Sequence, residues 1–126
     1  MTGYAGTMSS LTDAPFRLSD EPTRPEILAK YFRAFGDATR LRILELLVER
    51  EHSVGELVNL LGTSQPQVSN HLACLRWCGF VETRRAHRVV YYRLADERIS
   101  TIVSLADDLL EGNAEHVACC RRIDAV

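Results

Sequence analysis

The residues of this chain best suited to chemistry are its four cysteines, which fall into two pairs. Cys74 and Cys78 are four residues apart in a segment with helical apolar spacing, so their side chains are expected to be neighbours on one helix surface. Cys119 and Cys120 are adjacent to each other near the C-terminus. Thiolate ligand sets select soft ions, and three thiolates suit Cd(II), Pb(II) and As(III). The cysteines therefore indicate a site for a soft, thiophilic metal ion, with all four as candidate ligands.

Two other uses of these cysteines stay open at the level of the sequence. A cysteine is often a small buried apolar residue, which is the favoured interpretation for Cys78 taken alone. The same thiols could instead respond to oxidation, with no metal present. An enzyme is not expected, because the chain contains no nucleophile–base–acid set, no phosphate-binding loop and no catalytic metal motif.

Length and composition limit the kind of protein that carries these cysteines. With 126 residues, 46% of them hydrophobic and 25% charged, the chain is expected to be one globular domain with tails. It shows no membrane span and no signal-peptide layout, so a cytoplasmic protein is expected. In that compartment four cysteines favour free thiols or metal ligands over disulfides. We expect a flexible arm (1–23), a folded domain (24–112) and a cysteine-containing tail (113–126).

The first helices of the folded domain are predicted from apolar spacing and from residues that start or stop helices. A first helix is expected from Pro25 to the Gly36-Asp37 pair. Asp37 or Thr39 can cap a second helix. That helix is apolar around much of its circumference, and it is therefore expected to lie in the core.

Capping boxes predict the next two helices. Ser53 with Glu56 starts a short third helix, and Ser64 with Gln67 starts a fourth helix that runs to Cys78. The remaining expected elements are two strands, 80–84 and 89–94, around an arginine-rich turn, and a last amphipathic helix at 96–111. Two short helices followed by a basic hairpin predict a winged helix-turn-helix, a mainly α fold with a small β-hairpin wing.

The fourth helix has a polar face that suits DNA. Val68, Leu72 and Leu75 fall on one narrow stripe, which is expected to be buried. The other positions carry amide, hydroxyl and guanidinium groups, which can pair with base edges in a major groove or meet phosphates. The candidate DNA-binding residues on this helix are Gln65, Gln67, Ser69, Asn70 and Arg76.

The net charge of −2 conceals a basic segment in the middle of the chain. Residues 62–95 hold five arginines against one glutamate, and the residues on both sides are acidic overall. A local basic cluster is the electrostatic footprint of a polyanion contact. A solvated basic hairpin would show the same pattern, so the charge supports nucleic-acid binding but does not establish it.

Three strings resemble the ArsR/SmtB family of bacterial metal-responsive repressors: TRLRILELL at 39–47, SQPQVSNHLACLRWCGFV at 64–81 and RVVYYRL at 88–94. The resemblance covers about 24–112. It implies a homodimeric winged helix-turn-helix repressor that binds an inverted-repeat operator in double-stranded DNA when it is metal-free. It further implies that the first and last helices, 24–35 and 96–111, form the dimer interface.

The same resemblance assigns the parts that contact DNA. It implies a recognition helix at 64–78, beginning with Ser64, and a wing at 80–94. In the wing, Arg84, Arg85 and Arg88 are expected to meet phosphates. The chain departs from the family pattern at Ala86-His87, where relatives usually have a glycine in the wing turn.

Within that family, the run H-L-x-C-L-R-x-C-G at 71–79 is similar to that of the mycobacterial cadmium/lead sensors. This similarity implies that Cys74 and Cys78 are metal ligands and that a C-terminal cysteine of the other subunit completes the site. Cys119 and Cys120 compete for that third position. Cd(II) or Pb(II) is therefore the expected inducer, and the adjacent tail cysteines make As(III) a close second. The ligand patterns of other family sites, on the second, third and last helices, are not matched.

Overall fold

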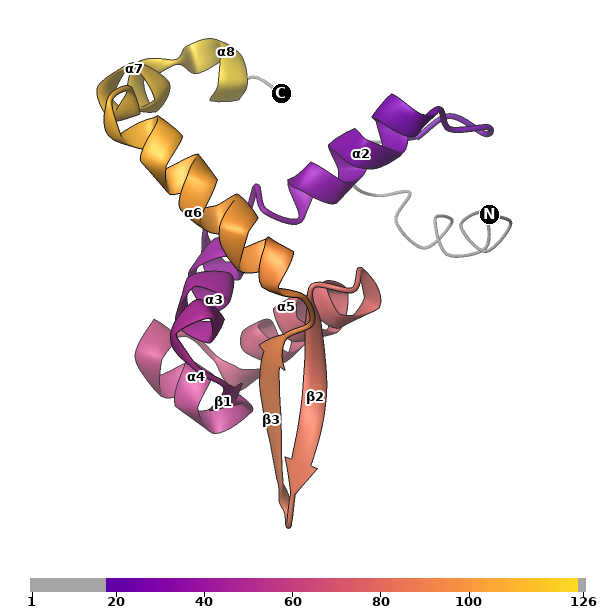
Figure 1. The fold of residues 1–126 in the computed structure, drawn as a ribbon, viewed down its shortest axis with the longest axis vertical. Helices are drawn as coiled ribbons and strands as arrows, with labels where there is room; N and C mark the ends of the chain where they lie inside the picture. Colours follow the sequence, from indigo (N-terminus) through magenta and orange to yellow (C-terminus); the bar gives the residue numbers. More distant parts are fainter. Residues whose placement is uncertain (1–17, 125–126) are drawn as a thin grey trace.

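The computed structural model describes residues 18–124, a helical body from which a β-hairpin projects (Figure 1). The elements in chain order are α2 (Arg24–Arg33), α3 (Ala38–Glu49), β1 (His52–Ser53), α4 (Val54–Leu61), α5 (Gln65–Trp77), β2 (Val81–Ala86), β3 (Val89–Leu94), α6 (Glu97–Glu111), α7 (Ala114–Cys119) and α8 (Arg121–Asp124). No helix in the described range is long and apolar enough to cross a membrane. Most of the expected arm at 1–23 lies outside the described residues.

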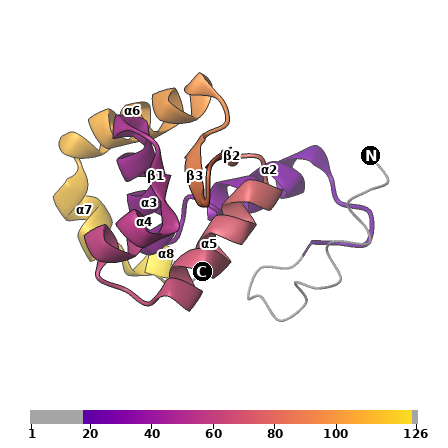
Figure 2. The same ribbon diagram turned by 90° about the horizontal axis from the view of Figure 1, so that it is seen from below.

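The hydrophobic core forms where α3, α4, α5 and α6 meet. Seen from below, α3 and α4 lie between α6 on one side and α5 on the other (Figure 2). Four residues of α3 are buried, which confirms that this helix is central. The buried apolar residues are Ala34, Ile43, Leu44, Leu46, Leu47, Leu57, Val68, Leu72, Leu75, Phe80, Val81, Ile99 and Val103.

Two predicted capping boxes have different outcomes. The box at the start of α4 is confirmed, since the Ser53 hydroxyl accepts the Glu56 N–H at 3.2 Å and the Glu56 carboxylate accepts the Ser53 N–H at 2.9 Å. The box at the start of α5 is only half formed. Ser64 accepts the Gln67 N–H at 3.4 Å, but the side chain of Gln67 accepts a hydrogen bond from the Thr63 hydroxyl instead of returning to Ser64. The Thr63 hydroxyl takes the place of the Ser64 backbone N–H as the hydrogen-bond donor to the Gln67 side chain.

Other element boundaries differ slightly from expectation. The first helix starts at Arg24, because Thr23 and Glu26 form a capping box that the sequence analysis did not include. Gly112 ends α6 as predicted. Beyond it, α7 and α8 are short helices that the apolar pattern did not predict.

The wing is part of a three-stranded antiparallel sheet in the order β1-β3-β2. Strand β2 extends to Ala86, which pairs with Val89, so the turn contains only two residues. The prediction of an arginine-rich turn after residue 84 was therefore wrong, because β-ladder pairing continues through Arg85. His87 has φ 58°, the left-handed conformation that favours glycine and that tight hairpin turns require at this position. Strand β1 was not predicted, since two residues carry no periodic signal.

Helix α2 is held to the body through aromatic rings. It has no fully buried residue and diverges from α6 in Figure 1. Tyr31 stacks on Phe80 with ring centroids 4.5 Å apart, and Phe35 meets the same ring edge-on at 4.8 Å. Phe80 has no exposed surface and stands between α5 and β2, so it joins α2 to both.

We expect Phe80→Ala to lower the free energy of unfolding by about 3–5 kcal/mol, because it removes a fully buried ring that two others contact. The measurement is urea denaturation followed by far-ultraviolet circular dichroism at one protein concentration. Leu60→Ala is the control: Leu60 is 51% exposed, so its loss should cost less than about 0.5 kcal/mol. Equal losses in the two variants would contradict the assigned role of Phe80.

Candidate nucleic-acid interface and thiol site

A tight turn between α4 and α5 sets the second helix at the surface. Gly62 has φ 69°, a left-handed conformation, and its N–H bonds the Val58 carbonyl at 2.9 Å to close α4. Ser64 then caps α5, and Pro66 occupies the first turn, where its missing N–H loses no helical hydrogen bond. The arrangement is a helix-turn-helix.

The side chains of α5 divide between core and surface as the apolar spacing predicts. Val68, Leu72 and Leu75 have no exposed surface. Trp77 is 74% exposed at the C-terminal end of the helix. The candidate DNA-binding residues of this region are all exposed: Ser64, Gln65, Gln67, Ser69, Asn70 and Arg76. Their exposure leaves them free to contact DNA, which stays a prediction.

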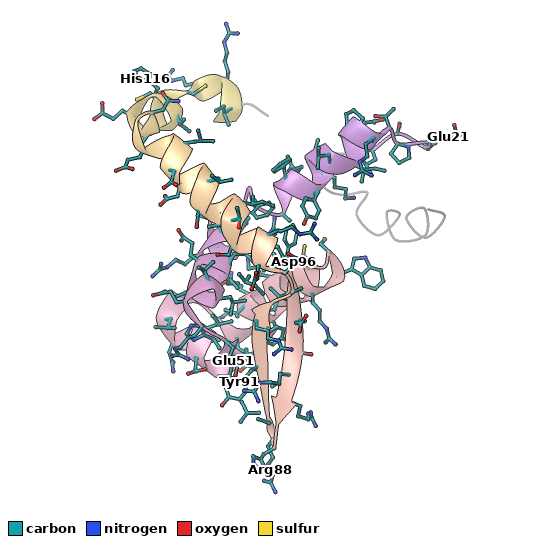
Figure 3. The ribbon with its side chains drawn as sticks, in the orientation of Figure 1. Glu21, Glu51, Arg88, Tyr91, Asp96 and His116 are labelled. Atoms are coloured by element: carbon teal, nitrogen blue, oxygen red, sulfur yellow. The ribbon has the colours of Figure 1, made fainter. Side chains whose placement is uncertain are left out.

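The three wing arginines occupy different positions. Arg84 and Arg85 belong to β2 and point to opposite faces of the sheet, because side chains alternate along a strand. Arg88 lies at the tip of the hairpin, where its side chain extends away from the body (Figure 3). Arg84 forms an ion pair with Glu51, and its guanidinium carbon lies 5.0 Å from the centre of the Tyr91 ring. The predicted phosphate contacts of these arginines are therefore not equivalent.

Cys74 and Cys78 lie next to each other on one flank of α5, and both are exposed. The Cys78 thiol donates a hydrogen bond to the Cys74 sulfur, which lowers the pKa of Cys74 to about 6 and raises the pKa of Cys78. The positive charges of Arg40 and Lys30 further favour the thiolate forms. The expectation that the two side chains are neighbours is confirmed, and the interpretation of Cys78 as a buried core residue is wrong.

Arg40 connects this thiol pair with the end of α2. Its Nε donates to the Ala34 carbonyl at 3.0 Å, and its Nη2 donates to the Arg33 carbonyl at 3.1 Å. These carbonyls are at the C-terminal end of α2, where helical hydrogen bonding leaves acceptors unsatisfied. The backbone N–H of Arg40 is bound by the Asp37 carboxylate at 3.0 Å, which caps α3. Arg40 thus holds the α2–α3 junction beside the cysteines.

The tail cysteines are not part of this pair. Cys119 ends α7 and is exposed, and Cys120 follows it and is half-buried. Figure 1 shows α7 and α8 at the opposite end of α6 from the wing. Within residues 18–124, no three His, Cys, Asp or Glu side chains come together as a metal-binding group. Within residues 18–124, α5 therefore brings together two of the four predicted ligands, and the tail cysteines lie apart from them.

Sequence reasoning missed the charged residues that surround these sites. Lys30 and Arg40 act on the cysteines from helices far away in the chain, and Glu51 is 33 residues from Arg84. Periodicity and capping patterns extend over only a few residues. They contain no signal for contacts of this kind.

Comparison with known proteins finds that this chain is similar to bacterial transcriptional regulators. Residues 37–83 match the family model of bacterial regulatory proteins described as the arsR family. The chain is 42% identical to a probable mercury resistance operon repressor of Streptomyces lividans, over 80% of this chain and 81% of that protein. It is 43% identical to the HTH-type transcriptional regulator CmtR of Mycobacterium tuberculosis, over 61% of this chain and 65% of that protein.

One of the related solved structures is described as a homodimer. The homodimeric winged helix-turn-helix DNA-binding domain Mb0332 of Mycobacterium bovis is 28% identical and superposes with a TM-score of 0.66. The superposition covers 79% of this chain and 95% of that domain. The predicted winged helix-turn-helix fold is therefore confirmed.

The thiol pair predicts an unusual pH dependence of alkylation. In a Cys119→Ser, Cys120→Ser background, the rate of Cys74 modification by iodoacetamide should reach half its maximum near pH 6, because the thiolate is the nucleophile. Cys78→Ala removes the hydrogen-bond donor and should move this midpoint upward, toward the ordinary thiol value of about 8.5. Peptide mapping by mass spectrometry identifies the modified residue. An unchanged midpoint in Cys78→Ala would show that the neighbouring thiol does not set the acidity of Cys74.

Proposed function

Because this chain belongs to the ArsR family of bacterial regulatory proteins, we propose that it is a homodimeric repressor whose operator binding is released by a soft, thiophilic metal ion. The observation that carries the proposal is the position of the Cys74–Cys78 pair on α5, the recognition helix itself. An ion held there would lie on the same helix as the proposed operator contacts, so that its binding can be coupled to operator binding. We place the protein in the cytoplasm, with the DNA it binds.

Operator contact is assigned to α5 and the wing. The exposed polar side chains of α5 suit a major groove, and the basic hairpin suits the phosphates beside it. Two copies related by a two-fold axis would bind an inverted repeat. The proposed contact residues are Ser64, Gln65, Gln67, Ser69, Asn70, Arg76, Arg84, Arg85 and Arg88.

The partner that completes the repressor is a second copy of this chain, bound through residues 24–35 and 96–111. Large apolar side chains of α2 and α6 are exposed in the single chain, among them Phe32 at 53%, Leu105 at 55% and Leu109 at 80%. Exposed apolar helix surfaces of this kind mark sites of association. The related Mb0332 domain is homodimeric, which supports the same assembly here.

The donor set fits a soft ion in part. Cys74 and Cys78 supply two sulfur ligands, and one of them is already acidic enough to be a thiolate at neutral pH. Cys119 or Cys120 of the second subunit is the proposed third ligand. Three sulfurs suit Cd(II) or Pb(II) first and As(III) next. The similarity to a probable mercury resistance operon repressor adds Hg(II), another soft ion, to the ions worth testing.

Regulation needs only a modest coupling between the two sites. A link from α5 of one subunit to the tail of the other would favour one relative placement of the two recognition helices. If that placement no longer matches two successive major grooves, operator affinity falls. Each tenfold loss corresponds to about 1.4 kcal/mol of coupling free energy, well within the range of allosteric proteins.

The lowered pKa of Cys74 favours a second candidate function, a thiol-redox switch. A thiolate beside a second thiol is the arrangement that oxidants attack, and a disulfide or sulfenic acid on α5 would disturb the same helix. Such a repressor would respond to hydrogen peroxide in the absence of metal. It would respond to no metal ion while a reductant keeps its thiols reduced.

We expect Cd(II), Pb(II), As(III) or Hg(II) to weaken operator binding at least tenfold under reducing conditions. The measurement is fluorescence anisotropy with a labelled duplex from the region upstream of the protein's own gene. Cys74→Ser and Cys78→Ser should bind this duplex normally but lose the response. Separate Cys119→Ser and Cys120→Ser variants identify the tail ligand, because only the loss of the true ligand should weaken the response to the metal ion. If none of these ions releases the wild-type protein, the metal-sensing proposal fails, and titration with hydrogen peroxide tests the redox alternative.

A charge in the α6 stripe should separate the two subunits. Leu109→Glu places a carboxylate in the proposed apolar interface, so sedimentation equilibrium should show a monomer where the wild type is a dimer. Leu60→Glu is the matched control, since Leu60 is also a largely exposed leucine but lies on α4. A dimeric Leu109→Glu variant would exclude α6 from the interface.

A further inference from the structure

We propose that Glu51 acts as an internal substitute for a DNA phosphate, holding Arg84 against the sheet and so limiting the affinity of the wing for DNA of any sequence. The proposal rests on the proposed DNA-binding function. It adds a residue that tunes this function from outside the recognition helix. Glu51 lies just before β1, at the edge of the wing sheet and outside the basic segment 62–95. The charge pattern of that segment therefore gives no indication of its role.

The sheet register explains how the two residues meet. Arg84 on β2 is paired with Tyr91 on β3, and Tyr91 is paired in turn with Ser53 on β1. Glu51 lies just before β1, so the Arg84 side chain crosses the face of β3 to reach it. Figure 3 shows Glu51 and Tyr91 close together beside the hairpin, with Arg88 far away at its tip.

The contact uses the full hydrogen-bonding geometry of the guanidinium group. Nε of Arg84 donates to Oε2 of Glu51 at 3.1 Å, and Nη2 donates to Oε1 of the same carboxylate. The guanidinium also lies over the Tyr91 ring, in a cation–π arrangement. In agreement with the pairing, the hydrogen bonds from Arg84 lower the pKa of Glu51. The charge of Arg84 is therefore already paired with that of Glu51, and its side chain is already held in one direction.

The other wing arginines provide the contrast. Arg85 and Arg88 are exposed and have no ion-pair partner in the part of the chain that the structure describes. They can neutralise phosphates without first leaving a carboxylate. Arg84 can do so only by exchanging Glu51 for a phosphate, since both anions use the same two-pronged donor face.

The consequence is a limit on non-specific binding. Binding that does not depend on sequence comes from neutralised phosphates, and each one adds about 0.9 to the slope of log affinity against log salt concentration. An exposed ion pair shifts such an exchange by only a few fold. Glu51 therefore weakens wing–phosphate contact moderately and does not abolish it, which leaves recognition more dependent on the base contacts of α5.

The test is the binding of Glu51→Gln to a labelled 30-base-pair duplex of random sequence, by fluorescence anisotropy between 50 and 200 mM salt. We expect roughly three- to fivefold tighter binding than wild type and a salt slope steeper by about 0.9, because one more arginine reaches a phosphate. Arg84→Gln should bind up to about threefold more weakly than wild type, a small loss because Glu51 already occupies Arg84 for most of the time. The double variant Glu51→Gln, Arg84→Gln should lose the gain in both affinity and slope.

Glu45→Gln is the control for net charge. It removes the same charge from an exposed carboxylate of α3 whose ion pair, with Arg42, is long at 3.9 Å. A gain equal to that of Glu51→Gln would attribute the effect to overall charge and overturn the proposal, as would a gain that persists in the double variant. A loss of tenfold or more in Arg84→Gln would overturn it too, by showing that Glu51 does not hold Arg84 back from phosphate. Failure of the wild-type protein to bind any duplex would instead contradict the DNA-binding function itself.

Discussion

The helical repeat of α5 is the constraint on which the rest of this molecule depends. With 3.6 residues per turn, one helix has to provide a core stripe, a polar surface and a thiol pair at once. Val68, Leu72 and Leu75 anchor it with no exposed surface. The polar face, the flank that carries Cys74 and the C-cap residue Cys78 all belong to this one anchored helix. The sulfurs therefore lie on the same element as the surface proposed for DNA.

A second set of contacts connects α5 to the helix proposed for dimerisation. Phe80 follows α5 directly and receives the rings of Tyr31 and Phe35 from the α2 region. Arg40 holds the end of α2 through two carbonyls and also lies near enough to the thiols to favour their charged forms. The thiol pair of α5 therefore lies beside the contacts that hold the helix proposed for dimerisation.

The electrostatics of the wing show why charge counts along a chain are incomplete. Residues 62–95 are strongly basic, yet Arg84 is paired with Glu51 from outside that segment and Arg93 is paired with Glu82 at 2.7 Å within it. The charge offered to a polyanion is therefore carried by the remaining arginines. Arg88 lies at the hairpin tip, Arg85 on β2 and Arg76 on α5, so their positions depend on the fold and not on the total charge.

The local features of this protein follow from short-range patterns in its amino-acid sequence. Helix limits near Gly62 and Gly112, the buried stripe of α5 and the neighbouring positions of Cys74 and Cys78 all follow from interactions between residues a few positions apart, and the structure confirms them. Local departures such as those at Gln67 and Arg85 arose where a competing local partner or continued strand pairing was available.

The surroundings of each reactive group depend instead on long-range contacts of the fold. Arg40 beside the thiols, Glu51 on Arg84 and Phe80 beneath α2 are contacts between segments far apart in the chain. The separation of Cys119 and Cys120 from the α5 pair is likewise a property of the fold, because the length of α6 places the tail at the other end of the body. Patterns of neighbouring residues identify which groups can react. Their charge and their partners are set by chain segments that meet only on folding.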